Sequence, residues 1–129
     1  MDSALYLAEL QVLSANLTSG VCKNLTDNEY KVMVFLKIYG VCSPKILINK
    51  IGILKTNLAL TLKKLIVKNF VSVNINSNDA RSKQYSLTNN GVDMIDSILN
   101  QISKLITRQS CQVCHSSLKN VVADLNKVL

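Results

Sequence analysis

The sequence predicts a mainly α-helical protein with one small β-hairpin, an α+β fold. Along most of the 129 residues apolar side chains recur at helical spacing, and only one Pro and four Gly interrupt them. Near residue 71 the apolar period changes from 3.6 residues to 2, the period of a half-buried strand. The chain contains two Phe, four Tyr and no Trp, so its core must be largely aliphatic. We expect a single domain over 1–129, because no linker or repeat divides the chain.

Two helices are expected in the N-terminal third of the chain. An apolar stripe predicts the first over 4–17, and Ser19-Gly20 should end it. Thr26 and Glu29 stand three residues apart and can form a capping box, in which each side chain satisfies a backbone N–H near the other. This box should begin the second helix, and Gly40 should stop it.

A short helix, a tight turn and a longer helix should follow. Ser43 as N-cap and Pro44 at the first helical position are typical of a helix start. Gly52 permits the left-handed turn that leads into the longer helix, which should run over about 54–68. Asn69 is expected at the end of that helix, because after Gly it is the residue that best tolerates a left-handed conformation.

A hairpin and two more helices complete the expected elements. Apolar and polar residues alternate from residue 71 and again through Tyr85 and Leu87, which predicts a hairpin over 71–87. Thr88 should cap a long helix that reaches about Arg108. A last helix should carry the apolar stripe Leu118, Val122, Leu125 and Leu129.

This order of elements (helix, short helix, tight turn, helix, hairpin) is that of a winged helix-turn-helix. We place the core over 25–88 and expect further helical regions over 1–20 and 89–129. Within such a core the helix over 54–68 is the recognition helix and the hairpin over 71–87 is the wing.

The net charge of +7 is concentrated in the predicted core. Nine basic residues and one acid lie between Lys37 and Lys83, whereas the rest of the chain has six basic and seven acidic residues. A basic surface of this kind suits a polyanion, and double-stranded DNA is the polyanion that fits a winged helix-turn-helix. A solubilising face without a binding role is the alternative that charge alone leaves open.

Other classes of protein have little support in the sequence. It has no Ser/His/Asp set, no phosphate-binding Gly-rich loop and no paired carboxylates, so we expect neither an enzyme nor a bound cofactor. The first residues lack the pattern of a signal peptide, and no apolar stretch reaches the roughly 18 to 20 residues that span a bilayer. We therefore expect a cytoplasmic protein whose four Cys residues are reduced thiols and not a disulfide framework: Cys22, Cys42, Cys111 and Cys114.

Cys111, Cys114 and His115 form a Cys-x-x-Cys-His motif. Its literal interpretation is a c-type haem attachment site, but that chemistry requires export. A redox thiol pair or a metal site would make the protein a thiol- or metal-responsive regulator, although a four-ligand zinc site would also need Cys22, Cys42 or carboxylates. We favour small thiols that pack near a helix junction, and we expect no metal.

The core also resembles the MarR family of bacterial and archaeal regulators, over about Leu25 to Leu99. The resemblance is carried by Leu25-Thr26 with Glu29, Leu47, Ile51-Gly52-Ile53, Leu65, Phe70-Val71, and the wing motif Asp79-Ala80-Arg81-Ser82 followed by Leu87-Thr88 and Gly91. The sequence departs from the family at Asn69, where Gly is usual, and at Leu54, where Ser or Thr usually caps the recognition helix. The first expected helix is also shorter than is usual in the family.

The resemblance implies a sequence-specific transcription regulator that binds a pseudo-palindromic operator as a homodimer, with 1–20 and 89–129 as dimerisation regions. It implies recognition helices in the major groove and wings in the minor groove. Relatives respond to phenolic ligands, oxidants or metals, so a small-molecule effector is left open, as is the choice between repressor and activator. A winged-helix module that docks on another protein is the alternative function, and the basic core argues against it.

We expect six residues on the outer face of the recognition helix to contact DNA: Lys55, Thr56, Asn57, Leu60, Thr61 and Lys64. Asn57 can bond an adenine edge, and Thr61 can contact bases or a thymine methyl. Lys55 and Lys64 suit phosphates, which position a protein without reading sequence. Leu60 either touches a thymine methyl or packs under the wing.

The wing should add contacts of its own. Arg81 is expected to enter the minor groove, with Asp79 orienting it. The alternative is that Asp79 and Arg81 only form an ion pair that makes the hairpin rigid. Ser43, Lys45 and Lys83 are secondary candidates for phosphate contacts.

Overall fold

The computed structural model describes residues 2–22, 24–75, 83–106 and 115–129. Its elements in chain order are α1 (Ser3–Val21), α2 (Asp27–Tyr39), β1 (Val41–Cys42), α3 (Pro44–Ile51), α4 (Lys55–Val67), β2 (Val71–Ile75), β3 (Lys83–Leu87), α5 (Asn89–Ile106) and α6 (His115–Val128). The expected mainly helical fold with a winged helix-turn-helix core is confirmed. None of the described helices is both long and apolar enough to cross a membrane.

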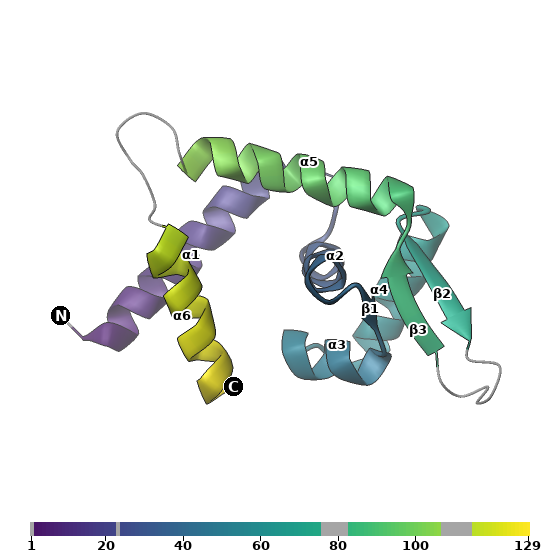
Figure 1. Cartoon of the computed structure of the whole chain (residues 1–129), viewed down its shortest axis with the longest axis horizontal. Helices are drawn as coiled ribbons and strands as arrows, with labels where there is room; N and C mark the ends of the chain where they lie inside the picture. The colour runs from purple at the N-terminus through teal and green to yellow at the C-terminus, as the bar shows by residue number, and fades with distance from the viewer. Residues whose placement is uncertain (1, 23, 76–82, 107–114) are drawn as a thin grey trace.

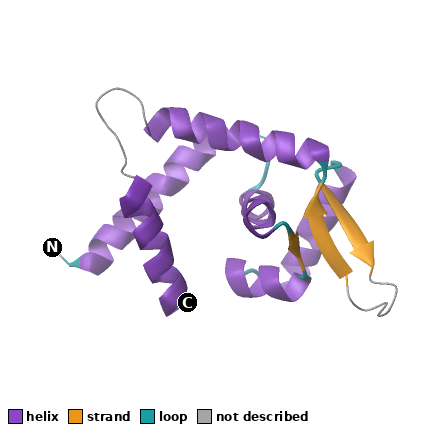
Figure 2. Cartoon of the chain, in the orientation of Figure 1, coloured by secondary structure: helices purple, strands orange, loops and turns teal. Residues whose placement is uncertain are grey.

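The molecule has two parts that α5 connects. Figure 1 shows α2, α3, α4 and the sheet gathered into one body, with α5 running across it. Helices α1 and α6 lie at the far end of α5, away from the sheet (Figure 2). Most of α1 and α6 therefore lies outside the winged helix-turn-helix, whereas α5, which the sequence also assigned to dimerisation, contributes Ile95 and Ile98 to its core.

Helix α1 is longer than expected, because Ser19-Gly20 does not end it. The hydroxyls of Thr18 and Ser19 donate hydrogen bonds to carbonyls about one turn earlier. The Cys22 N–H then donates to the Thr18 carbonyl at 2.9 Å. A helical Gly costs only about 1 kcal/mol relative to Ala, which is too little to stop a helix whose last turn is hydrogen-bonded in this way.

Local chemistry begins and ends α2 and α3 as predicted. The Thr26 N–H donates to Glu29 Oε1 at 3.0 Å and the Glu29 N–H donates to Thr26 Oγ1 at 3.2 Å, which completes the capping box. Ser43 Oγ accepts a hydrogen bond from the Ile46 N–H at 3.4 Å. Gly52 has φ +74°, the left-handed conformation that the turn between α3 and α4 requires.

The sheet has one strand more than the sequence predicted. Its order is β1-β3-β2, all antiparallel, with Val71 paired to Leu87 and Ile75 paired to Lys83 in the hairpin. The additional strand β1 pairs Val41 with Ser86. A strand of two residues is too short to show an alternating pattern, so the sequence gives no signal for it.

Side chains from α2, α3, α4, α5 and the sheet form the core. Its completely buried members are Val32, Met33, Leu36, Cys42, Leu47, Leu58, Leu65 and Ile95. As the composition predicted, this core contains no large aromatic cluster. The hairpin contributes only Val71 and Tyr85 to the buried set, so its distal half projects beyond the core.

A compact junction fixes the base of the wing. Asn69 follows α4 with φ +64°, as predicted for the end of this helix. Thr88 Oγ1 donates to the Asn69 carbonyl at 2.6 Å and accepts from the Gly91 N–H at 3.0 Å. A Cβ atom on Gly91 would lie 2.0 Å from the Phe70 carbonyl oxygen, so only Gly fits there. The Leu-Thr-x-x-Gly motif thus ties α4, the wing and α5 together.

Candidate nucleic-acid interface

The candidate interface is the solvent-facing side of α4. Leu58, Leu62 and Leu65 are buried and fix which side of the helix faces the core. Lys55, Thr56, Asn57 and Lys64 are exposed, as predicted. Leu60 is 59% exposed, which excludes the alternative that it packs under the wing in the described structure.

The expectation that Thr61 lies on the outer face is wrong. Its side chain is buried, with a relative exposure of 6%. Thr61 follows Leu58 by three residues, so it falls on the same side of the helix as the buried leucines. Its hydroxyl donates to the Asn57 carbonyl at 2.7 Å, which satisfies the polar group without solvent.

Lys63 belongs to the outer face and was missed. It is exposed and follows Thr56 by seven residues, which places both on one side of α4. Leu60 lies between them on the same side. The heptad spacing from Thr56 was present in the sequence and could have identified Lys63.

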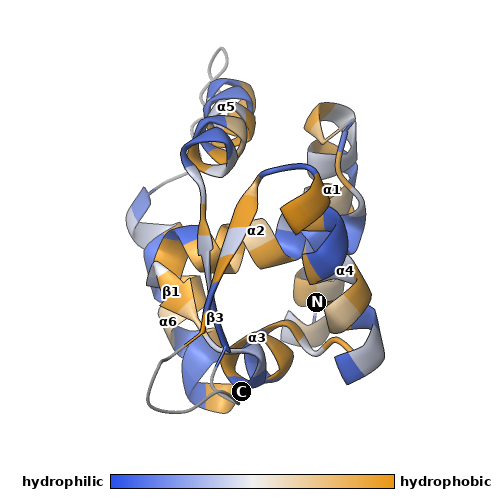
Figure 3. Cartoon of the chain, turned by 90° about the vertical axis from the view of Figure 1, so that its right-hand side faces the viewer, coloured by the Kyte–Doolittle hydropathy of each residue, from blue (hydrophilic) through white to orange (hydrophobic). Residues whose placement is uncertain are grey.

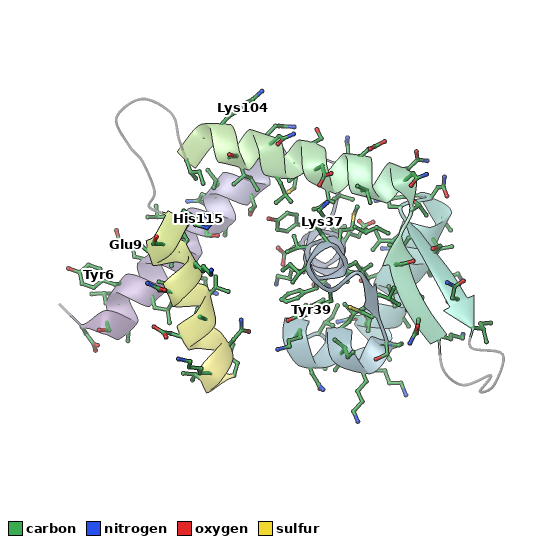
Figure 4. The ribbon with its side chains drawn as sticks, in the orientation of Figure 1. Tyr6, Glu9, Lys37, Tyr39, Lys104 and His115 are labelled. Carbon is green, nitrogen blue, oxygen red and sulfur yellow. The ribbon has the colours of Figure 1, made fainter. Side chains whose placement is uncertain are left out.

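Three of the core's basic residues are neutralised within the protein. Lys31 Nζ lies 2.9 Å from Asp27 Oδ2. Lys37 Nζ lies 3.0 Å from Asp96 Oδ1, and Figure 4 shows Lys37 directed from α2 toward α5. Lys68 Nζ lies 2.7 Å from Glu29 Oε2. In the described part of the chain, no ion pair involves Lys45, Lys50, Lys55, Lys63, Lys64 or Lys83. The positive charge available to a polyanion is thus concentrated on α3, α4 and the hairpin.

The Lys68–Glu29 pair connects the end of α4 to the start of α2. The Glu29 side chain is almost completely buried, whereas that of Lys68 is 38% exposed. Lys68 Nζ also donates to the Asn24 carbonyl at 3.3 Å. Burial by itself raises the pKa of the Glu29 carboxyl, but the hydrogen bonds from Lys68 and Thr26 lower it by more, so the pKa lies below its ordinary value.

A shallow hollow lies between α4 and the start of α2. It is lined by Thr26, Asn28, Asn57, Leu60, Thr61 and Lys64. Amide and ammonium groups from two helices therefore meet around one open depression. Asn28 was not among the predicted site residues, because it is 29 residues away from Asn57 and only the fold brings them together.

The other predicted DNA contacts lie on α3 and the hairpin, and only some of them are among the described residues. Lys45 and Lys83 are exposed, while Ser43 is half-buried and its hydroxyl already serves as the N-cap of α3. Asp79 and Arg81 lie outside the described residues. Figure 3, which looks onto the hairpin end, shows α5 at the top and α3 at the bottom, with the hairpin descending from α5 toward α3.

The cysteine motif is only partly described. Cys111 and Cys114 lie outside the described residues, and His115 is exposed at the start of α6. Within the described ranges no three His, Cys, Asp or Glu side chains are grouped as a metal site would require. Burial raises the pKa of the Cys42 thiol, and burial together with Asp27 raises that of Cys22, so neither thiol is activated as a thiolate.

Solved structures share this fold over the whole chain. Wild-type MarR from E. coli, in its apo form, superposes with a TM-score of 0.73 at 17% identity, covering 100% of this chain and 98% of MarR. NadR in complex with 4-hydroxyphenylacetate gives a TM-score of 0.84 at 20% identity, covering 100% and 95%. An E. coli MarR mutant complexed with operator DNA gives 0.63 at 17% identity, covering 100% and 99%. No family model and no curated protein matches the sequence.

Proposed function

We propose, from the MarR-like winged-helix fold that the whole chain adopts, that this protein is a sequence-specific, double-stranded DNA-binding transcription regulator. The observation that carries the proposal is the charge of the exposed helices. Helices α3 and α4 contain five lysines and no acidic residue, and none of these lysines is in an ion pair within the described structure. Such a surface attracts phosphates, and a helix is the element that enters the major groove.

Each part of α4 has a role in this proposal. Thr56 and Asn57 lie in the first turn, the part of a recognition helix that contacts base edges. Lys55 and Lys64 contact phosphates on either side, and Lys63 is a further phosphate contact. In the wing, Arg81 enters the minor groove and Asp79 orients it. Lys83 contacts a phosphate beside the groove.

The relatives support this role by analogy of fold. An E. coli MarR mutant with this fold was solved in complex with operator DNA. For Bordetella bronchiseptica BpsR, which gives a TM-score of 0.71 at 15% identity, DNA binding is regulated by 6-hydroxynicotinic acid. We include in the proposal that a small molecule regulates DNA binding by the present protein, and we assign no chemical class to that molecule.

We propose further that the protein binds as a homodimer. No residue of α1 or α6 is buried, although both helices are rich in large apolar side chains. Figure 4 shows Tyr6 projecting from α1 away from the winged-helix body. A second copy that covers these side chains would place two recognition helices on a pseudo-palindromic operator, with half-sites about 10 bp apart. Such a regulator works in the cytoplasm, where the operator is.

A gel-shift titration over a range of salt concentrations tests the proposed function. Duplexes recovered from a random library should bind with a log affinity that falls linearly with log salt, by about 0.9 for each phosphate contact. Affinity that does not depend on salt, or the recovery of no duplex at all, would contradict DNA binding. A protein-docking module would give the second result.

Lys64→Ala removes two phosphate contacts from a homodimer, so it should lower the salt slope by about two units and weaken binding to all duplexes to a similar extent. The reason is that a phosphate contact adds affinity without reading sequence. Lys119→Ala is the matched control, because it also removes an exposed lysine, on α6, which lies away from α4 (Figure 1). Equal salt slopes for the two variants would show that Lys64 makes no phosphate contact.

A further inference from the structure

The outer face of α4 is unusually apolar for a surface between lysines. Leu60 and Val67, seven residues apart on this face, are 59% and 80% exposed. Val67 is the last residue of the helix, whereas Leu60 lies in its middle, between Thr56 and Lys63 on the same side. Exposed apolar surface at this position carries a hydration cost that a bound apolar group would relieve.

The polar groups of α4 restrict which bases it can read. The helix contains no Arg, Gln, Asp or Glu, and Asn57 is its one amide. An Asn side chain pairs with the N6 and N7 atoms of adenine, whereas Arg is the most frequent reader of guanine. Guanine could be bonded by a lysine of α4 or by the Thr56 hydroxyl, but these lysines are the residues best suited to phosphates and a hydroxyl does not discriminate between bases.

The position of Leu60 fits a base next to the one that Asn57 meets. Three residues of α-helix correspond to a rise of about 4.5 Å, and neighbouring base pairs are about 3.4 Å apart. Leu60 also borders the open hollow that Asn57 and Lys64 line, so the three side chains face one region of space. The apolar group that DNA presents in the major groove is the thymine C5 methyl.

We propose that Leu60 reads a thymine methyl, so that each operator half-site has an A·T pair there, beside an adenine bonded by Asn57. This inference rests on the proposed function and specifies its base preference. It makes Leu60 a specificity-determining residue and α4 a reader of A·T-rich sequence.

Replacing single thymines by deoxyuridine tests this inference directly, because only the methyl group is lost. The probe is a duplex selected from a random library by the full-length protein. Each half-site should contain one position at which a single replacement weakens binding of the wild type about fourfold. This factor corresponds to the free energy of burying one methyl-sized group. Leu60→Ala should bind the thymine duplex less tightly and should not distinguish thymine from deoxyuridine at that position.

Val67→Ala is the matched control. Val67 is exposed on the same side of α4 but lies in the last turn, beyond the part of a recognition helix that contacts bases, so this variant should keep the wild-type response to deoxyuridine. Because Leu60 and Val67 are both exposed, neither variant should unfold. A G·C-rich consensus, or an equal deoxyuridine effect in Leu60→Ala, would overturn the inference and leave DNA binding intact. Failure to select any duplex would overturn the proposed function and the inference with it.

Discussion

Lys68→Met should destabilise the protein by about 2 kcal/mol at neutral pH. The substitution removes the ammonium group that pairs with Glu29, whose side chain is 1% exposed. Removing one partner of a fully buried ion pair costs about 3 to 5 kcal/mol, because the other charge is left buried without compensation. The cost should be smaller here, since solvent reaches Lys68 and already weakens the pair.

The pH dependence of this effect has a definite sign. In the wild type the pKa of Glu29 is lowered, so the carboxylate contributes stability above about pH 4.3 that is lost as the pH falls through the folded-state pKa. In Lys68→Met no ammonium group offsets the effect of burial on the carboxyl, so the pKa of Glu29 should rise relative to the wild type. Protonation then relieves the buried charge, and the stability difference between the two proteins should shrink on acidification.

Urea unfolding at pH 7 and near pH 5, at one protein concentration, measures both quantities. Lys63→Met is the control, because it removes an exposed lysine of the same helix that forms no ion pair in the described structure. It should change stability by less than about 0.5 kcal/mol at either pH. A Lys68→Met variant that behaves like this control would mean that the Glu29 carboxylate is already compensated by Thr26.

The elements that sequence analysis predicted are those whose determinants are local. Thr26, Ser43 and Thr88 act on backbone groups within three residues of themselves, and all three form the expected caps. Strand β1 could not be predicted, because two residues pair with β3 some 45 positions later. The contact between Lys68 and Glu29 is missed for the same reason, since 39 residues separate them.

The candidate site was predicted by residue type, and residue type was less reliable than helical angle. Thr61 was expected on the outer face with the other polar residues of α4, yet its spacing from Leu58 puts it on the buried side of the helix. Lys63 was left out, although the same angular argument from Thr56 puts it outside. A Thr side chain tolerates burial when its hydroxyl donates a hydrogen bond to a carbonyl one turn earlier, as the Thr61 hydroxyl does to the Asn57 carbonyl.

Helix α6 has an apolar side that its own chain leaves exposed. Leu118, Val122 and Leu125 follow one another at spacings of four and three residues, which puts them on one side of the helix. They are 40%, 58% and 36% exposed in the single chain, so the chain itself does not cover them. Asn120 lies on the opposite side of the helix. An amphipathic helix that does not bury its apolar side within its own chain is typical of an interface between subunits.

Val122→Asp should therefore convert the dimer into monomers and weaken operator binding about a hundredfold or more. In a homodimer the substitution introduces two charges into the same apolar interface, and each subunit then loses the gain from binding two linked half-sites. Asn120→Asp adds the same charge to the polar side and should leave both properties unchanged. Light scattering during size-exclusion chromatography gives the mass, and gel shifts give the affinity.

A duplex that contains one half-site separates loss of dimerisation from damage to the reading surface. Helix α6 lies away from α4 in the fold (Figure 1), so Val122→Asp monomers should bind a single half-site as tightly as one wild-type subunit does. Only the full operator should distinguish the two proteins, because only there does the second recognition helix add affinity. A Val122→Asp protein that remains a dimer would exclude this face of α6 from the interface. Equal weakening on both duplexes would show instead that the substitution disturbs the winged-helix body.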